Sequence, residues 1–587
     1  MFKEKKLLRK LWECLNRRRR LQFFLLLALM VLAAILEVVS LGAVLPFLGV
    51  ITNPEQVYQF LQAQSFINFT EIKSAHSLVF PITMLFIFVV IFSGLVRLFL
   101  LYAITKFSFS TGADLSFDIY RRTLYQNFSV HISRNSSEII NSIAIKTNTV
   151  VNGVINPILS FISSLVILIA IMGTLLFIDT KIALIALFGF GFFYIVITIF
   201  TRKRLKINSD LISKESTQVI KLLQEGLGGI RDVLIDGNQK FYYNLYRGSD
   251  LPLRRALGEN QYISASPRYA MEAVGMALIA IIAYTMTQGD RSESVIPILG
   301  ALALGAQRLL PALQQVYSSY STVKGSISSL RDVIFLLKQP LPKNIENQAL
   351  NPIEFRREIS LKNVGFRYSS NAPLSLSGVN LTIAKGSCVG FIGVTGSGKS
   401  TLLDIIMGLL SPTIGKLTID GEMVTDENRR VWQSNIAHVP QNIYLSDSTI
   451  EENIAFGIPK EEINHQRVKE VAKQAHIAEL VEGWKDGYQT FVGEQGIRLS
   501  GGQRQRIGIA RALYKKAKVL IFDEATSALD GQTEKKIMNI INKLDNDLTI
   551  LIIAHRVTTL KECDQIIDIS ELGNIVVKKY DDIFSDT

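Results

Sequence analysis

Six long apolar runs occupy the first half of the chain, and polar, often basic segments separate them. Each run is long enough to cross a bilayer, because roughly 20 helical residues span the hydrocarbon core. A cleaved secretory signal has a shorter apolar core, so we interpret the first run as a retained helix. The pattern predicts an α-helical six-span transmembrane domain with spans at 21–51, 79–104, 156–178, 182–201, 269–287 and 294–320.

The two long connections between spans, 105–155 and 202–267, keep apolar positions at helical spacing, for example in 114–125 and 216–227. Disordered segments lack such regularly placed apolar residues. We therefore predict that the spanning helices continue beyond the bilayer and turn back there. The sixth run is the least apolar, and we expect its inner end to leave the bilayer as a helix.

Basic residues flank the apolar runs unequally. Residues 1–20 hold nine Lys and Arg, whereas 52–78 holds only Lys73 and 288–293 only Arg291. Cytoplasmic flanks of membrane proteins carry the excess of Lys and Arg. We therefore predict that the N-terminus, both long connections and the C-terminal half lie in the cytoplasm.

The overall charge changes this picture little. A net charge of +12 could indicate a nucleic-acid partner or an anionic membrane surface. The basic residues cluster beside apolar runs, as in 17–20 and 202–206, so we attribute them to membrane orientation and expect no nucleic-acid partner. Three cysteines that lie far apart, without a C-x-x-C pair, predict reduced thiols rather than a disulfide framework or a metal site.

The second half of the chain is different. A Pro-containing polar stretch, 338–352, is typical of a linker, so we place a transmembrane domain at 1–337 and a second domain at 353–587. Short β-like runs alternate there with helical patterns, which predicts an α/β domain with helices packed on a largely parallel sheet. The expected strands are 359–368, 389–392, 436–439, 519–522 and 549–553.

Residues 393–400 read Gly-Val-Thr-Gly-Ser-Gly-Lys-Ser and follow an expected strand. They fit G-x-x-x-x-G-K-[ST], a loop whose backbone N–H groups hold phosphates at a helix N-terminus. Lys399 can reach the terminal phosphates, and the Ser400 hydroxyl can bind Mg²⁺. We expect the phosphate-contacting residues to be Gly393, Thr395, Gly396, Ser397, Gly398, Lys399, Ser400 and Thr401.

Two further motifs carry chemistry. The apolar run 519–522 ends in Asp523 and Glu524, which places one carboxylate to hold Mg²⁺ and the next to accept a proton from an attacking water. A Ser-Gly-Gly run then opens another helix and predicts a second anion site there. Its residues are Ser500, Gly501, Gly502 and Gln503. A second phosphate site indicates a second nucleotide, or one nucleotide shared with another copy of the domain.

In this order, 393–400, 499–503 and 522–530 resemble the nucleotide-binding domain of ATP-binding cassette (ABC) transporters. Residues 499–503 resemble the family's own signature, which is more specific than the phosphate loop. Tyr368 resembles the aromatic residue that stacks on adenine, and Gln441 resembles the glutamine that contacts Mg²⁺. Residues 493–496 resemble an export-type loop. Asp530, in 527–530, resembles the D-loop aspartate, and His555 resembles the switch histidine.

The resemblance covers the whole chain and implies a half-transporter of the exporter type in a bacterial inner membrane. It implies a homodimer with ATP and Mg²⁺, in which Lys399 of one subunit and Ser500 of the other hold one ATP. It also implies ATP hydrolysis coupled to transport. Glu524, His555, Lys399 and Gln441 are then the catalytic residues, and Ser400, Gln441 and Asp523 the Mg²⁺ ligands.

Within the family, the membrane half resembles flippases for lipid-linked oligosaccharides. Arg97, Arg268 and Arg308 lie in segments where such flippases carry cavity arginines facing a diphosphate. Arg97 and Arg268 could instead reach the membrane interface, and Arg268 could pair with Glu272 one helical turn on. An anionic lipid-linked substrate is therefore the prediction, with lipid A, phospholipid or drug export as the alternative.

Other classes fit the chain less well. Peptide export usually needs a leader-peptidase segment, for which residues 1–20 leave no room. A membrane-tethered ABC ATPase that does not transport would typically carry paired cassettes or coiled-coil inserts. An importer is disfavoured because the spans and the cassette share one polypeptide.

Overall fold

The chain divides into two compact units, the first made of residues 1–126 and 134–341 and the second of residues 127–133 and 342–587. A short segment from the middle of the helical half therefore belongs with the second unit. The computed structural model describes residues 2–52, 54–55, 58–59, 75–178, 180–287, 295–341, 355–369, 371–525, 531–541, 547–554, 557–570 and 575–580.

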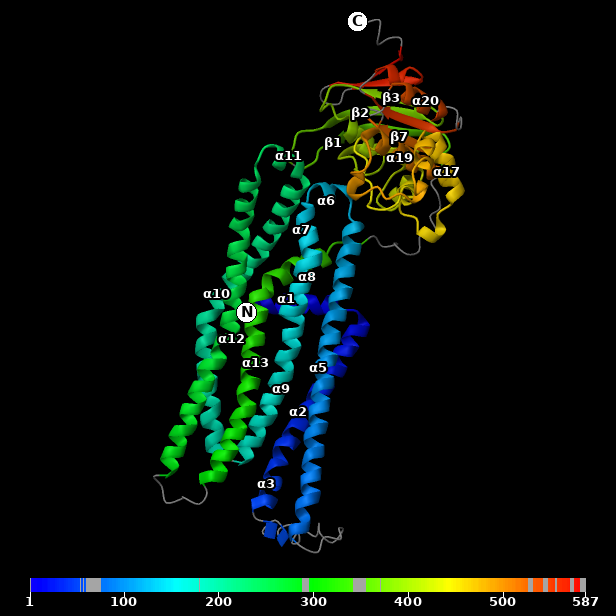
Figure 1. The fold of residues 1–587 in the computed structure, drawn as a ribbon. Helices are drawn as coiled ribbons and strands as arrows, with labels where there is room; N and C mark the ends of the chain where they lie inside the picture. Colours follow the sequence, from blue (N-terminus) through cyan, green and yellow to red (C-terminus); the bar gives the residue numbers. More distant parts are fainter. Residues whose placement is uncertain are drawn as a thin grey trace. The chain divides into compact units, whose positions relative to one another are not determined.

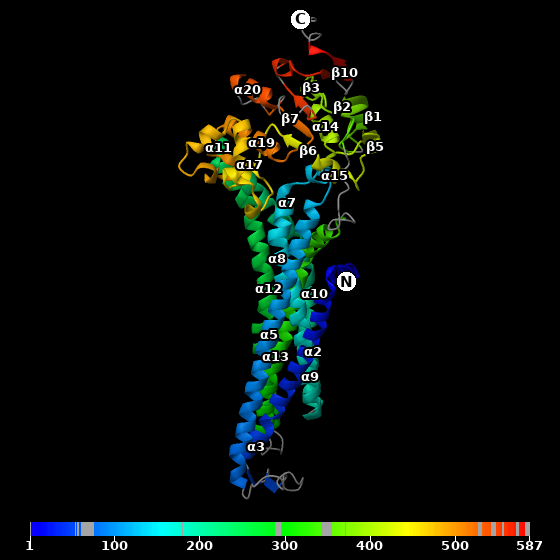
Figure 2. The same ribbon diagram turned by 90° about the vertical axis from the view of Figure 1, so that its right-hand side faces the viewer.

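The first unit contains helices and short turns but no strand among its described residues, and its long helices lie side by side (Figures 1 and 2). Its α-helices are α1 (Phe2–Cys14), α2 (Arg17–Gly42), α3 (Val44–Thr52), α5 (Val79–Leu124), α7 (Ser136–Asn141), α8 (Thr147–Val150), α9 (Asn156–Ile178), α10 (Thr180–Gly228), α11 (Ile230–Ile235), α12 (Gln239–Thr287) and α13 (Val295–Leu337). Its other helical turns are the 3₁₀ turn η2 (Ala75–Leu78) and the π-helical turns η3 (Ser142–Lys146) and η4 (Val151–Ile155).

The long helices exceed the thickness of a bilayer. α5 has 46 residues and α10 has 49, which at about 1.5 Å per residue is roughly 70 Å, against a hydrocarbon core of about 30 Å. The long connections are largely helical, so the alternative of disordered connections is wrong. That these helices continue beyond the bilayer stays a prediction, which their length supports. Within the described residues, three helical stretches are long and apolar enough to cross a membrane: Arg17–Gly42, Val79–Leu124 and Ser136–Thr174.

The first apolar run departs from the single helix that was expected over 21–51. α2 ends at Gly42, and α3 begins at Val44. Pro46 explains the interruption, because a proline lacks an N–H donor and its ring clashes with the carbonyl four residues earlier, here that of Gly42.

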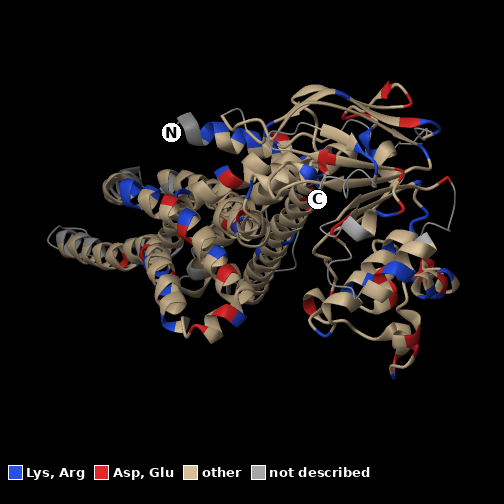
Figure 3. Ribbon diagram, turned by 90° about the horizontal axis from the view of Figure 1, so that it is seen from above, with Lys and Arg blue, Asp and Glu red and all other residues tan. Residues whose placement is uncertain are grey.

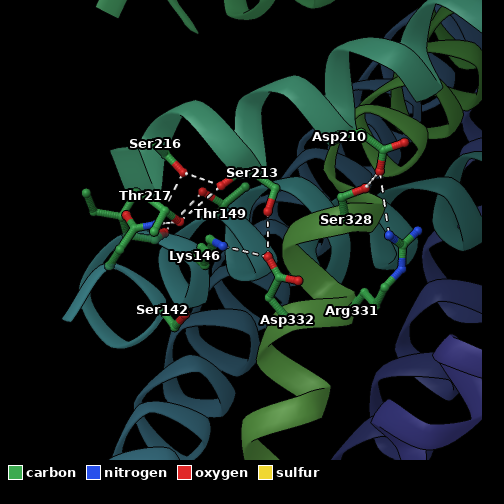
Figure 4. Close-up of polar contacts among 12 residues, drawn as sticks. Ser142, Lys146, Thr149, Asp210, Ser213, Ser216, Thr217, Ser328, Arg331 and Asp332 are labelled. Carbon is green, nitrogen blue, oxygen red and sulfur yellow. Dashed lines mark hydrogen bonds and ion pairs between the residues drawn. The ribbon is translucent and has the colours of Figure 1, made fainter. Parts of the chain in front are cut away.

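A polar cluster joins η3, α10 and α13 (Figure 4). The Lys146 ammonium lies 2.6 Å from Asp332 Oδ2, and the Ser213 hydroxyl donates to the same oxygen at 2.5 Å. Ser328 donates in the opposite direction, from α13 to Asp210 Oδ1 on α10, at 2.5 Å. The two helices thus each offer a carboxylate to a serine of the other, which fixes their register at this level.

The second unit contains two sheets and a helical segment. Its strands are β1 (Glu358–Phe366), β2 (Leu376–Ala384), β3 (Cys388–Ile392), β4 (Ile414–Ile419), β5 (Glu422–Met423), β6 (Ile436–Val439), β7 (Val519–Asp523), β8 (Thr549–Ile553), β9 (Gln565–Ile569) and β10 (Ile575–Lys578). One sheet has the order β10-β9-β3-β8-β7-β6, parallel apart from β10, and the other is antiparallel with the order β2-β1-β4-β5.

Helices pack around these sheets, and two apolar cores fill the space between the layers. The helices are α6 (Phe128–Ile132), α14 (Lys399–Ile406), α15 (Arg429–Ser434), α16 (Ile450–Ile454), α17 (His465–Gln474), α18 (Ala478–Glu482), α19 (Gly501–Tyr514) and α20 (Gly531–Ile541), with 3₁₀ turns η6 (Lys460–Glu462), η7 (Gly487–Gln489), η8 (Glu494–Gly496) and η9 (Val557–Leu560). β8 is buried along its whole length, as expected for a strand covered on both faces.

The predicted strands are all present, and the largely parallel sheet is confirmed. The antiparallel sheet was not predicted. Strand β2 largely alternates buried and exposed residues, and β4 begins with exposed residues. Both therefore lack the continuous apolar run that marked the central strands.

Candidate functional site

The phosphate-type loop lies between β3 and α14, and its glycines are required by the backbone. Gly393, Gly396 and Gly398 have φ values of 144°, 88° and 98°, a region that other residues avoid. A Cβ at Gly393 would lie 2.3 Å from the carbonyl oxygen of Ile569, and one at Gly398 would lie 2.9 Å from that of Ser375. The loop therefore turns tightly onto the N-terminus of α14, where backbone N–H groups favour an anion.

Lys399 is held at this loop. Its ammonium donates to the carbonyl oxygens of Gly393 and Val394, each at 2.8 Å, and the residue is only 9% exposed. The Ser397 hydroxyl is buried in the same loop without a hydrogen-bond partner among the described residues. A cradle of glycines with a lysine and an unpartnered hydroxyl fits a phosphate chain. Thr395 and Ser400 are exposed.

Tyr368 stands beside this loop. Its hydroxyl lies 2.8 Å from Thr401 Oγ1 on α14, and its ring meets the edge of Phe366 with the ring centroids 5.0 Å apart. The side chain is 53% exposed. An exposed aromatic face next to a phosphate cradle is suited to stacking on a flat base.

Two neighbouring strands bring the catalytic candidates together. β6 and β7 are parallel partners, with Val439 opposite Phe522, so the residues that follow them meet at one edge of the sheet. Gln441 Nε2 donates to Glu524 Oε2 at 2.5 Å. Glu524 adopts a φ of 51° and its backbone N–H donates to Ile553 at the end of β8, which fixes the direction of its carboxylate.

The electrostatics of this edge concern three acids. Burial raises the pKa of Asp523, the nearby Glu524 raises it further, and Lys399 lowers it. Burial and then the charge of Asp523 raise the pKa of Asp404, on α14, to about 6. Sequence reasoning missed Asp404, although an acid within the apolar helical run after Lys399 is a detectable signal. Oxygen ligands of this kind suit Mg²⁺.

The Ser-Gly-Gly motif forms a second helix N-terminus. Ser500 caps α19 in a capping box: its hydroxyl accepts from the Gln503 N–H at 3.3 Å, and its own N–H donates to the Gln503 side chain at 2.8 Å. Gly501 and Gly502 form the first helical turn. Among the described residues, no hydrogen bond joins this cap to the 393–400 loop, so the two phosphate-type sites are separate within one chain.

Three predicted site residues lie outside what the structure describes. His555 and Asp530 fall in undescribed positions, and for Arg308 the backbone belongs to α13 but the side chain is not described.

Sequence reasoning also missed a docking element. α6 packs Phe128 against the core around β1, β2 and β3, and Arg429 on α15 donates to Asn127 Oδ1 at 3.0 Å. α6 lies in the chain between α5 and α7 of the first unit, although its residues belong with the second unit. The break in helical pattern near 125–135 was the only signal in the sequence.

The membrane arginines are paired rather than isolated. Arg97 Nη1 contacts Glu37 at 3.2 Å, and Glu37 is buried. Arg268 Nε contacts Glu272 at 2.8 Å, one helical turn away. The structure thus contains the Arg268–Glu272 pair that the sequence offered as an alternative. Arg97 pairs with Glu37, which lies far from it in the sequence.

Comparison with known proteins agrees with these observations. The family described as "ABC transporter transmembrane region" matches residues 21–295, and the family described as "ABC transporter" matches residues 376–527. An ATP-dependent lipid A-core flippase of Saccharophagus degradans is 30% identical over 472 residues, which are 79% of this chain and 78% of that protein.

Two further proteins are similar. The leukotoxin export ATP-binding protein LtxB of Aggregatibacter actinomycetemcomitans is 37% identical over 310 residues, which are 52% of this chain and 42% of that protein. The chain also resembles the structure of a bacterial Atm1-family ABC exporter with ATP bound, with a TM-score of 0.75 and 22% sequence identity. The match covers 93% of this chain and 95% of the exporter chain, and it supports the fold. The chain therefore belongs to the ABC transporter family, as an exporter-type half-transporter with one helical transmembrane domain followed by one ATPase domain.

Proposed function

We propose that two copies of this chain form a homodimer that hydrolyses ATP to move an anionic glycolipid across a bacterial inner membrane. A lipid-linked oligosaccharide, or a related polysaccharide precursor, is the first candidate substrate. The nucleotide domains and the N-terminus face the cytoplasm, as the basic flanks indicate. The observation that most supports the ATPase assignment is the 2.5 Å contact between Gln441 and Glu524 beside the 393–400 loop.

Each residue of the loop edge then has a role in hydrolysis. Lys399 exchanges its two loop carbonyls for phosphate oxygens, and Tyr368 stacks on adenine. Ser400, Gln441 and Asp523 would hold Mg²⁺, which would supply positive charge to balance that of the phosphates. Glu524, positioned by Gln441, accepts a proton from the attacking water, and His555 acts as the switch histidine. Positioning and charge stabilisation dominate this class of reaction.

The separation of the two anion sites supports the proposed homodimer. One chain carries a phosphate loop at Lys399 and a second helix N-terminus at Ser500, and no hydrogen bond joins the two sites among the described residues. Two chains related by a two-fold axis can each present Ser500 to the partner's loop, because in a two-fold interface residue i of one subunit contacts residue j of the other and the reverse contact also forms. Residues 501–503 and Asp530 would complete each shared site.

The substrate class is supported by charge within the bilayer. Among the described residues, Arg97 contacts Glu37 only through Nη1 and is half exposed, so its other N–H donors can bind a phosphate. Arg268 is also more than half exposed beside Glu272. Arginine forks suit phosphate recognition. Because both arginines carry carboxylate partners, we expect a monophosphate or diphosphate lipid to bind beside these pairs rather than in a purely cationic cavity.

A second candidate substrate is lipid A with its core sugars. The similarity that favours it is the lipid A-core flippase of Saccharophagus degradans, which this chain matches over 78% of that protein. Both candidates are phosphate-bearing glycolipids and would use the same arginines.

ATPase stimulation in proteoliposomes tests the proposal. We expect lipid-linked oligosaccharide or lipid A to stimulate hydrolysis, and plain phospholipid not to. Arg97→Ala should lose the stimulation while basal hydrolysis remains, whereas Arg254→Ala, which removes an exposed arginine paired with Asp250 one turn away, should not. Stimulation that survives Arg97→Ala would remove the charge argument, and stimulation by neither glycolipid would remove the substrate class.

A further inference from the structure

An apolar cavity lies where the N-terminal helix meets the membrane helices. It has a volume of about 170 Å³ and is walled by α1, α2, α5 and the start of α9. Leu11, Trp12, Phe23, Phe107 and Leu159 are among its lining residues. An apolar cavity of this size can hold a small hydrocarbon, because a dry cavity of about 150 Å³ binds benzene. The volume therefore suits a segment of an alkyl chain.

The cavity lies at the depth of a membrane interface. α2 begins its apolar run directly after the basic residues 17–20, and Phe107 and Leu159 lie near the ends of the predicted second and third spans. α1 crosses the bundle helices instead of running along them (Figure 1). An amphipathic helix in this orientation typically lies in the plane of the interface with its apolar face toward the acyl chains.

One polar group in the cavity wall has no partner. Thr111, on α5, is 1% exposed, and its hydroxyl makes no hydrogen bond with the described residues. A threonine in a helix usually donates to the carbonyl four residues earlier, as Thr123 does. An unpartnered hydroxyl in an otherwise apolar cavity is suited to a ligand that carries an oxygen near its hydrocarbon, such as an ester.

Positive charge surrounds the entrance to this region. Lys and Arg recur along the helix that starts at the N-terminus (Figure 3). Lys5, Lys6 and Arg9 are exposed on α1, and Arg17 and Arg18 are exposed at the start of α2.

Arg20 connects that charge to the cavity wall. Its guanidinium lies 5.8 Å from the ring centroid of Trp12, and its Nε atom is buried without a hydrogen-bond partner among the described residues. Arg20 Nη2 donates to the Glu13 carbonyl oxygen at 3.0 Å, and a guanidinium has five N–H donors. Its remaining donors can bind an anionic headgroup next to the aromatic wall.

We propose that this cavity is a binding site for one acyl chain of an anionic membrane phospholipid, with Thr111 facing the ester region and Arg20 the headgroup. The site is separate from the proposed transport of a glycolipid, because it is formed by α1 and the interfacial ends of the helices and needs no nucleotide. Anionic lipids accumulate in the cytoplasmic leaflet and attract basic juxtamembrane segments, which matches the predicted orientation of α1.

Tryptophan fluorescence gives a direct test. The chain has three tryptophans. Trp12 lines the cavity, whereas Trp432 and Trp484 pack in or against the cores of the second unit. The full-length protein is placed in phosphatidylcholine nanodiscs with increasing fractions of either bromoacyl phosphatidylglycerol or bromoacyl phosphatidylcholine. A Trp12→Phe variant supplies the background from the other two tryptophans.

We expect the anionic bromolipid to quench Trp12 at a roughly fivefold lower mole fraction than the zwitterionic one, as for one engaged basic residue. Arg20→Gln should remove this preference, and Arg9→Gln, which changes an arginine 82% exposed and paired with Glu13, should keep it. Equal quenching by both lipids in the unmodified protein would overturn the proposal, whatever the variants do.

Filling the cavity separates specific binding from a general surface charge. Ile158→Phe enlarges a side chain in the wall, and we expect it to abolish the difference between the two lipids. Leu25→Phe, at a position of α2 that is 63% exposed, is the matched control and should not change it. A preference for the anionic lipid that persists in a folded, ATP-hydrolysing Ile158→Phe protein would show that α1 attracts lipid only as a charged surface. The nanodiscs contain no glycolipid, so failure here leaves the transport proposal intact.

Discussion

The partly buried ion pair between Lys146 and Asp332 gives the sharpest prediction about stability. The two side chains differ in exposure: 6% for Lys146 and 35% for Asp332. Removing one partner of a buried pair typically costs about 3–5 kcal/mol, because the other charge remains buried without compensation. Asp332→Asn leaves the more buried charge behind, whereas Lys146→Met leaves a carboxylate that reaches water and keeps its bond from Ser213.

The magnitudes follow from that asymmetry. A cavity of about 390 Å³ next to Lys146 admits water, so we expect Asp332→Asn to cost about 2–3 kcal/mol, below the full range. Lys146→Met should cost about 1 kcal/mol or less. With about 2–4 °C per kcal/mol for a large domain, the melting temperature of the purified protein should fall by roughly 5–10 °C for Asp332→Asn and by roughly 2–4 °C for Lys146→Met.

Thermal unfolding of the single variants and the double variant measures the coupling. Once Lys146 is removed, Asp332→Asn should add little further loss, so the two effects should be far from additive. Lys221→Met, which disrupts an exposed pair with Glu225 at 3.6 Å, is the matched control and should change the melting temperature by less than about 2 °C. The reasoning from burial would be refuted if Lys146→Met lowered the melting temperature as much as Asp332→Asn does. Additive losses in the double variant would also refute it.

Three further predictions concern the ATPase domain. Glu524→Gln keeps the shape and the contact with Gln441 but removes the base, so ATP binding should persist while turnover falls by about 10²–10⁴-fold; undiminished hydrolysis would exclude the assignment. Lys399→Ala and Ser500→Arg should each inactivate a homodimer. In an equal mixture of the two variants, half of the dimers contain one subunit of each kind and therefore one intact shared site, so roughly a quarter of the activity should return. No recovery would contradict the shared site. The pKa of Asp404 is raised from 3.8 to about 6 in the folded state. Between these two pH values the folded state keeps a proton on Asp404 that the unfolded state has lost. The stability of the nucleotide-free protein should therefore fall as pH rises from about 4 to 6. Asp404→Asn should flatten that slope, and an unchanged slope in thermal unfolding would show that Asp404 does not cause it.

Local patterns in the sequence determined much of the fold. The continuous apolar runs of β3, β6, β7 and β8 were predicted because buried parallel strands carry apolar residues on both faces. The long helices were predicted because apolar positions keep helical spacing beyond the bilayer. The strands β2 and β4 were not predicted, because a strand with one covered face has a weaker hydrophobic pattern in the sequence.

Contacts between distant residues required the structure. Glu37 and Arg97 both carry a charge within a span, but their spacing in the sequence gives no reason to pair them. α6 is too short to stand out from its surroundings, and its role depends on Arg429 and the core that receives Phe128. The apolar cavity below α1 likewise depends on helices from separate parts of the chain.

The sequence by itself determined the chemistry of the nucleotide site, because the loop at Lys399, the acids at Asp523 and Glu524 and the cap at Ser500 are each contiguous motifs whose function follows from local backbone geometry. Only the tertiary structure decided which of these groups meet. Adjacent parallel strands bring Gln441 to Glu524, whereas the Ser500 cap makes no hydrogen bond to the loop among the described residues. The physical reason is that a motif fixes local geometry within a few residues, while strand order and helix packing fix which motifs are neighbours.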